Sequence, residues 1–186
     1  MRKWIISLLT GAFAVLSFSG CMMGDNYYGK GYETIEQAWD AGRIMEYEDD
    51  DYDIAQEIAR LEFVGGTKWL YISKGGYFVE VDLVYENESW WTKSYGSHEI
   101  AELKEWYEFI QEEGYENDLY HILPGTNVLI GSRLHDGKTV CVNGVDATTE
   151  TYTIAYEDVI CVLDYWYLAN FNSDDYDSIV ITYKGE

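Results

Sequence analysis

The most regular hydrophobic pattern in the chain is a strict alternation between residues 77 and 86. One set of alternate positions is wholly apolar or aromatic, whereas the other set contains three acidic residues. A period of two is that of a strand with one face against a core and one face in water. An apolar run at 69–72 comes before it, and the Gly75-Gly76 pair between the two runs predicts a hairpin.

Three other segments have the spacing of amphipathic helices. A capping box followed by apolar residues predicts a short helix over about 34–44. The apolar spacing within 54–61 predicts a second helix that starts near Asp51. An apolar stripe within 97–114, closed by a glycine, predicts a third helix.

The C-terminal half is rich in β-branched and aromatic residues, which favour strands. The predicted strands are separated by turn residues and cover 128–130, 139–142, 150–156, 159–167 and 178–183. We therefore predict an α+β fold, a predominantly antiparallel sheet with about three helices in the N-terminal half and a strand-rich C-terminal half.

Two resemblances offer alternatives to a single α+β domain over 33–186. The order of the predicted elements is similar to that of the NTF2-like cone. The segment from Val140 to Ala147 resembles a strand and turn of Ig-like extracellular modules. That second resemblance implies a helical and hairpin lobe over 33–118 and a separate β lobe over 119–186.

Charge limits the partners that this protein can have. The chain carries 34 acidic and 12 basic residues, a formal net charge of -22. Such a surface repels nucleic acid and anionic lipid, so we expect no nucleic-acid partner. Aromatic residues make up 17% of the chain, which favours a packed fold over disorder because they supply large buried areas.

The first residues of the chain have the order of an export signal. Arg2 and Lys3 come before an apolar run from Trp4 to Leu16, and Phe18-Ser19-Gly20-Cys21 closes the segment. This segment resembles the lipobox of bacterial lipoproteins, with phenylalanine where leucine is usual. The apolar run is shorter than the roughly 20 residues that a membrane span needs. An ordinary secretory signal and an uncleaved helix are the alternative interpretations.

The lipobox resemblance implies a location and an anchor. It implies a signal peptide over 1–20, cleavage between Gly20 and Cys21, and a diacylglycerol thioether on Cys21. The residues over 21–32 contain several glycines and no hydrophobic period, so we expect the lipidated cysteine to be followed by a flexible tether. The protein would then be exported and anchored to the extracytoplasmic face of the bacterial cell membrane, or to the outer membrane in a host that has two.

No motif for metal or cofactor chemistry is complete in the sequence. Asp49, Asp51 and Asp53 have the spacing of the first calcium ligands of an EF-hand, but Ile54 and Arg60 occupy the positions that need glycine and glutamate. The three histidines are far apart, without the short spacing of zinc ligands, and the glycine patterns of serine hydrolases and phosphate loops are absent. We therefore expect neither a metal nor a cofactor.

Acidic residues are so abundant that paired carboxylates carry little information about function. A hydrolase with two close carboxylates stays an alternative, but sequence does not place any two of them at the about 5–9 Å that glycosidases use. Without catalytic motifs, we expect binding rather than catalysis.

Cys141 and Cys161 could form a disulfide, because an exported protein meets an oxidising environment. Their neighbours on the two predicted strands suggest that the side chains point to different faces, which favours two separate thiols. Both interpretations stay open.

Adjacent aromatic residues are the features most typical of a binding surface. Trp90 and Trp91 are neighbours, as are Tyr165 and Trp166, and consecutive side chains on a strand point to opposite faces. One ring of each pair could be exposed and bind a glycan, or a basic protein or peptide attracted by the acidic surface. The alternative is that all four rings belong to the core.

Our leading hypothesis from sequence is a lipid-anchored, non-enzymatic domain that binds a partner or ligand outside the membrane. A carbohydrate-binding module is the second hypothesis and a hydrolase is the third. The sequence does not indicate an oligomeric state.

Overall fold

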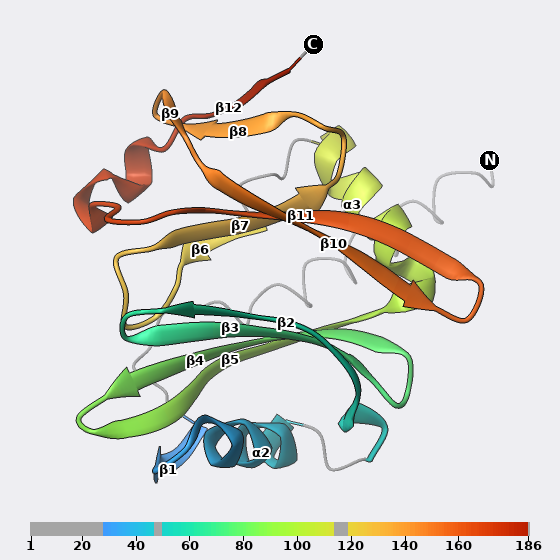
Figure 1. Ribbon diagram of the computed structural model, residues 1–186, viewed down its shortest axis with the longest axis vertical. Helices are drawn as coiled ribbons and strands as arrows, with labels where there is room; N and C mark the ends of the chain where they lie inside the picture. Colours follow the sequence, from blue (N-terminus) through green and yellow to red (C-terminus); the bar gives the residue numbers. More distant parts are fainter. Residues whose placement is uncertain (1–27, 47–49, 114–118, 186) are drawn as a thin grey trace, which may run out of the picture.

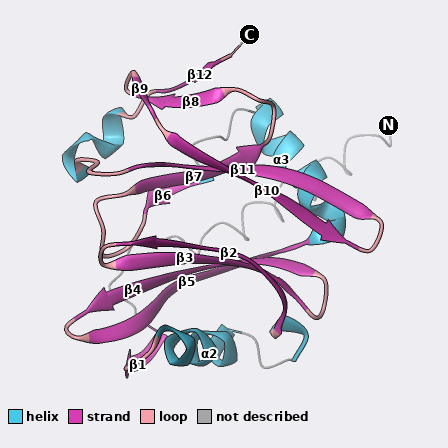
Figure 2. Cartoon of the chain, viewed as in Figure 1, coloured by secondary structure: helices cyan, strands magenta, loops and turns pink. Residues whose placement is uncertain are grey.

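The computed structural model describes residues 28–46, 50–113 and 119–185. Three antiparallel sheets lie one above another, and strands make up most of the described chain (Figure 2). A helix covers the outer face of the first sheet, and a second helix lies beside the middle sheet (Figure 1). Among the described residues, no helix combines the length and the apolar content that a membrane crossing requires.

Sheet A contains five strands, all from the N-terminal half of the chain. In spatial order they are β1 (Tyr28–Tyr32), β5 (Ser89–Glu99), β4 (Tyr77–Glu86), β3 (Gly66–Ser73) and β2 (Ile54–Phe63). Helix α2 (Ile35–Glu46) packs against the apolar set of β3 and β4, which includes Trp69, Val79 and Val81. A short 3-10 turn at Asp50–Tyr52 leads into β2. The alternating pattern at 77–86 is therefore confirmed as a strand, and its apolar set faces α2.

Sheet B contains four strands from the C-terminal half. In spatial order they are β10 (Thr148–Tyr156), β11 (Val159–Leu168), β7 (Leu129–Leu134) and β6 (Tyr120–Ile122). Helix α3 (Ile100–Glu113) follows β5 directly and buries Ile100, Leu103, Tyr107 and Ile110, the stripe on which its prediction rested. The helices predicted over 34–44 and within 97–114 are thus confirmed.

Sheet C is small and covers the outer face of sheet B. Its strands are β12 (Ile181–Lys184), β8 (Thr139–Val142) and β9 (Val145–Asp146). A 3-10 helix at Ser173–Ser178 comes before β12, and the Asn172 side chain caps it by accepting from the backbone of Asp174. Val140, Val142 and Trp166 are buried between sheets B and C.

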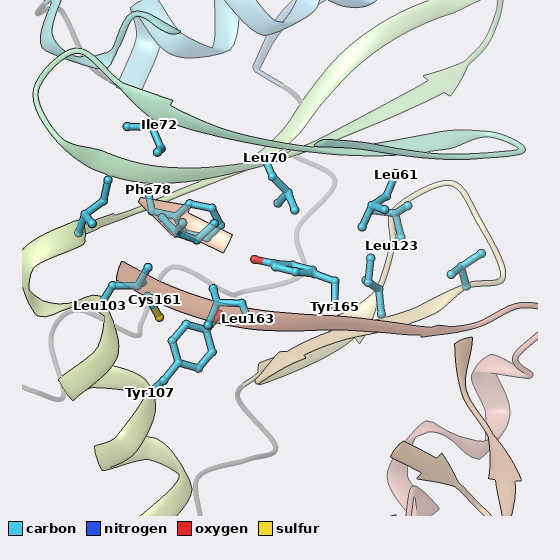
Figure 3. Packing of buried hydrophobic residues seen from close by; sticks show 14 residues of the cluster. Leu61, Leu70, Ile72, Phe78, Leu103, Tyr107, Leu123, Cys161, Leu163 and Tyr165 are labelled. Atoms are coloured by element: carbon cyan, nitrogen blue, oxygen red, sulfur yellow. The ribbon is translucent and has the colours of Figure 1, made fainter. Parts of the chain in front are cut away.

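The main hydrophobic core lies between sheets A and B. Figure 3 shows Leu70 and Phe78 from sheet A facing Leu163 and Tyr165 from sheet B, with Tyr107 of α3 beside them. Burying such side chains is worth about 1.5–3 kcal/mol each. The two halves of the chain therefore share one core.

The predicted α+β class is wrong, because the described chain is a β-rich structure. The segment at 54–63 is a strand rather than a helix, although its residues favour a helix. Register shifts interrupt its pairing with β3 between Ile54 and Gln56 and between Glu57 and Ala59. Each irregularity breaks the period of two, so the apolar residues take a spacing that imitates a helix.

The two alternative folds are also wrong. Residues 140–147, which resemble an Ig-like strand and turn, form β8 and β9 at the outside of sheet B rather than in a separate lobe. The helices lie on different layers and do not assemble the predicted cone (Figure 1). The flexible tether predicted over 21–32 is also wrong at its end, because Tyr28–Tyr32 is strand β1 at the edge of sheet A.

Candidate functional site

A pocket of about 140 Å³ lies between sheets A and B beside α3. Polar side chains from both sheets line much of it. They are Lys68, Glu80, His98, His121, Ser132 and Tyr165. Six different strands supply these groups, so the pocket exists only when the two sheets pack together.

The alternation of β4 explains why acidic side chains lie inside the molecule. Glu80 and Asp82 belong to the set expected to face water, but sheet B covers that face. In the register of sheet A, Asp82 lies opposite Lys68 on β3 and opposite Ser94 on β5. Neighbouring strands thereby bring a cation and two carboxylates to one spot.

Asp82 is the centre of a buried polar cluster. Its Oδ1 accepts from the Lys68 ammonium at 3.1 Å, and its Oδ2 lies 2.7 Å from Ser94 Oγ and 2.9 Å from His121 Nε2. The side chains of Asp82 and Lys68 are only 4% and 7% exposed. Burial alone would raise the pKa of Asp82, but the charges of Lys68 and His121 and the hydrogen bonds outweigh it and hold that pKa well below its usual range.

Glu80 is the second carboxylate of the cluster and remains partly accessible. Its Oε1 accepts a hydrogen bond from the Tyr165 hydroxyl and lies 4.0 Å from the Lys68 ammonium. Its side chain is 21% exposed, and it lines the pocket. Burial and the Glu80 charge raise the pKa of Tyr165 well above its usual range, so this phenol stays protonated and donates.

Aromatic rings form another part of the pocket wall. The rings of His98, at the end of β5, and Trp106, on α3, have centroids 4.2 Å apart at 34°. Burial lowers the pKa of His98 and the nearby Glu80 charge only partly opposes this, so the imidazole favours its neutral form. Tyr107 lies next to Trp106 and donates a hydrogen bond to Ser132 Oγ at 2.8 Å.

These groups can hold a small polar molecule by charge, by hydrogen bonds and by ring contact. Within the part of the chain that the structure describes, no three His, Cys, Asp or Glu side chains gather as metal ligands. The third histidine, His135, lies elsewhere and contacts the buried Asp164 at 2.8 Å.

The aromatic residues chosen from sequence do not form an open platform. Tyr165 and Trp166 are buried, at 0% and 3% exposure, on opposite faces of β11. Tyr165 nevertheless lines the pocket through its hydroxyl side. Trp90 and Trp91 are partly buried on β5, where Trp90 packs against Tyr85 at 5.2 Å and Trp91 Nε1 donates to the backbone oxygen of Glu86.

The two cysteines of the domain are free thiols in different sheets. Cys141 lies on β8 of sheet C, and its Sγ is 2.9 Å from Asp146 Oδ1. Cys161 lies on β11 of sheet B within the main core. The disulfide interpretation does not match this structure. The predicted cleavage site at Gly20 and the predicted lipidation site at Cys21 lie outside the described residues.

Sequence reasoning missed Lys68, Glu80, Asp82 and both pocket histidines as site residues. One signal was present, because Lys68 stands directly beside the apolar run at 69–72 and a buried strand rarely carries a lysine without a partner. The alternation at 77–86 showed which side the acids share, but not that a second sheet covers that side.

No protein-family model, curated protein or solved structure matches this chain.

Proposed function

We propose that this protein is a lipid-anchored extracytoplasmic binding protein whose ligand occupies the pocket between sheets A and B. The anchor rests on the lipobox-like segment that ends at Cys21. An acidic domain is repelled by an anionic membrane surface, so a covalent anchor is the simplest means of holding it there.

One observation carries the binding function: the buried Lys68–Asp82 pair beside an accessible pocket. Removing two charges from water costs several kcal/mol per ion, and apolar residues in the same place often give equal or greater stability. A pair of this kind is poorly explained by stability alone. Charged groups in a cleft with a perturbed pKa are instead typical of functional sites.

The protonation states favour binding over acid–base catalysis. The hydrogen bonds and nearby positive charges hold the pKa of Asp82 low, so it is a poor proton carrier near neutral pH. Burial raises the pKa of Tyr107 and of Tyr165, so both phenols act as hydrogen-bond donors rather than bases. Such groups orient a ligand without reacting with it.

A hydrolase is the second candidate function, and one observation favours it. Glu80 and Asp82 lie on the same face of β4 and approach the same lysine ammonium, as a carboxylate pair would. Release of nitrophenol from a panel of nitrophenyl glycosides, abolished by Glu80→Gln, would support this alternative over binding alone.

The anchor is tested in bacteria that express the full chain. We expect a palmitate analogue to label the protein and Cys21→Ser to abolish both the label and membrane retention. Mass spectrometry of the mature protein should find the lipidated cysteine at the amino terminus. An intact amino terminus, or an unmodified residue 21 in membrane extracts, would contradict the anchor.

The pocket is tested by ligand-observed NMR with a library of small polar fragments and the full chain in nonionic detergent. Ser132→Val adds bulk to the pocket wall, and Ser173→Val is a matched change on the exposed 3-10 helix. We expect bound fragments to lose at least tenfold in affinity with Ser132→Val and to be unaffected by Ser173→Val. If the bound fragments keep their affinity for both variants, the ligand site lies outside this pocket.

A further inference from the structure

The two carboxylates of the pocket differ in how closely a cation approaches them. The Lys68 ammonium is matched by Asp82 at 3.1 Å, and both oxygens of that carboxylate already have partners. Glu80 is a second carboxylate in the same cluster, and Lys68 lies farther from it, at 4.0 Å. Asp82 therefore has the close contacts of Lys68 and His121, whereas the ion-pair contact of Glu80 is the longer one to Lys68.

Glu80 has acceptor capacity left for a ligand. A carboxylate offers about four lone-pair sites. The Tyr165 hydroxyl is hydrogen-bonded to Oε1, and no described residue is hydrogen-bonded to Oε2. Because the side chain is partly exposed and lines the pocket, an entering ligand can reach this carboxylate.

The aromatic side of the pocket suits a positive group as well. Trp106 is the ring type that attracts cations most strongly, and contacts of this kind are worth about 0.5–2 kcal/mol. His98, which packs on it, favours its neutral form and so adds no competing charge. The phenols of Tyr107 and Tyr165 complete the wall with donors whose oxygens can face a cation.

We propose that the ligand of this pocket is a small organic cation, an amine or a methylated ammonium, bound by Glu80 and by the His98 and Trp106 rings. This inference rests on the proposed function and names its ligand class. The pocket volume of about 140 Å³ limits the ligand to a small molecule such as methylammonium or choline. The net charge of -22 would also raise the local concentration of cations and speed their association.

The test compares ligands of the same shape and different charge. Choline and 3,3-dimethylbutan-1-ol differ by one charged nitrogen in place of carbon, and acetate serves as an anionic probe. Titration calorimetry on the full chain in nonionic detergent, at constant ionic strength, measures each affinity. We expect choline or methylammonium to bind and the neutral isostere to bind at least tenfold more weakly.

Glu80→Gln removes the charge but keeps an oxygen that can accept from Tyr165. Glu62→Gln is the matched control, because Glu62 is exposed on β2. We expect Glu80→Gln to lower the affinity for the cation at least tenfold and Glu62→Gln to leave it unchanged. Circular dichroism establishes that both variants are folded.

Two outcomes would overturn the inference in different ways. Equal affinity for choline and its neutral isostere, or full affinity after Glu80→Gln, would show that charge recognition at Glu80 does not occur. Binding of acetate or a neutral fragment that Ser132→Val abolishes, without any binding of the cations, would overturn the cation and leave the proposed binding function standing. If no cation, anion or neutral fragment binds, both the cation proposal and the proposed binding function are overturned.

Discussion

The ammonium of Lys68 lies 3.1 Å from Oδ1 of Asp82 in the interior between two sheets, with both side chains almost fully buried. Breaking a buried pair by removing one partner typically costs about 3–5 kcal/mol, because the other charge is left uncompensated. We expect Asp82→Asn to lower the free energy of unfolding by about that amount. Urea denaturation followed by tryptophan fluorescence measures the change.

The control for Asp82→Asn is an exposed pair. Glu108→Gln removes the partner of Lys104, where the side chains of Glu108 and Lys104 are 50% and 59% exposed. Exposed helix pairs contribute only about 0.3–0.5 kcal/mol.

The double variant Lys68→Met with Asp82→Leu should retain wild-type stability or exceed it, since apolar replacements of buried pairs are often neutral or stabilising. A small effect of Asp82→Asn, similar to that of Glu108→Gln, would contradict the prediction.

The same carboxylate should make stability depend on pH in the acid range. Its pKa in the folded protein is held below the unfolded value of about 3.9. The stabilising contribution is therefore fully present above that unfolded value and is lost as the pH falls toward the folded pKa. The stability difference between wild type and Asp82→Asn should shrink between about pH 5 and pH 2. A difference that stays constant over this range would show that Asp82 is not the titrating group.

Local patterns predicted the elements whose hydrophobic period is intact. Strand β4 at 77–86 and helix α3 each keep a single hydrophobic period over their whole length. The segment at 54–63 does not, because two irregularities in its pairing with β3 depend on a neighbouring strand that local sequence does not reveal. Tertiary pairing then outweighs the helix propensity of its Ala, Glu, Arg and Leu residues.

The candidate site was harder to predict than the fold, because its groups come from distant parts of the chain. Its groups lie on six strands and a helix, and 97 positions separate Lys68 from Tyr165 in the numbering. No short motif can carry such an arrangement. Burial of the acidic side of β4 depends on how sheet B packs over sheet A, and that is a property of the assembled fold.

Gly131 on β7 should be indispensable to the packing between sheets B and C. A Cβ at this position would lie 2.4 Å from the Trp166 ring and 2.9 Å from Tyr120 Cβ. Gly131→Ala should therefore cost about 1–3 kcal/mol through overpacking. Gly96→Ala on β5 is the matched control, because a Cβ there has one neighbour, at 3.9 Å, and should be tolerated. Equal stability of the two variants in urea would contradict this interpretation.

The two thiols should react slowly until the protein unfolds. Burial raises the pKa of Cys161 to about 11, and a hydrogen bond to Asp146, together with burial, raises the pKa of Cys141. At pH 8 only about one Cys161 side chain in a thousand would be the reactive thiolate, and the core excludes the reagent. We expect labelling by Ellman's reagent to be at least a hundredfold slower in the native protein than in denaturant.

The number of thiols that react in denaturant decides between free cysteines and a disulfide. Apart from Cys21, which the proposed lipid would block, two thiols should react without any reductant, one from Cys141 and one from Cys161. Cys141→Ser and Cys161→Ser should each remove one of them and identify the slower site. A bridge formed during export would leave no reactive thiol in the unreduced wild type, and each single variant would then gain one. That gain would contradict the structure, because the two side chains lie on strands of different sheets.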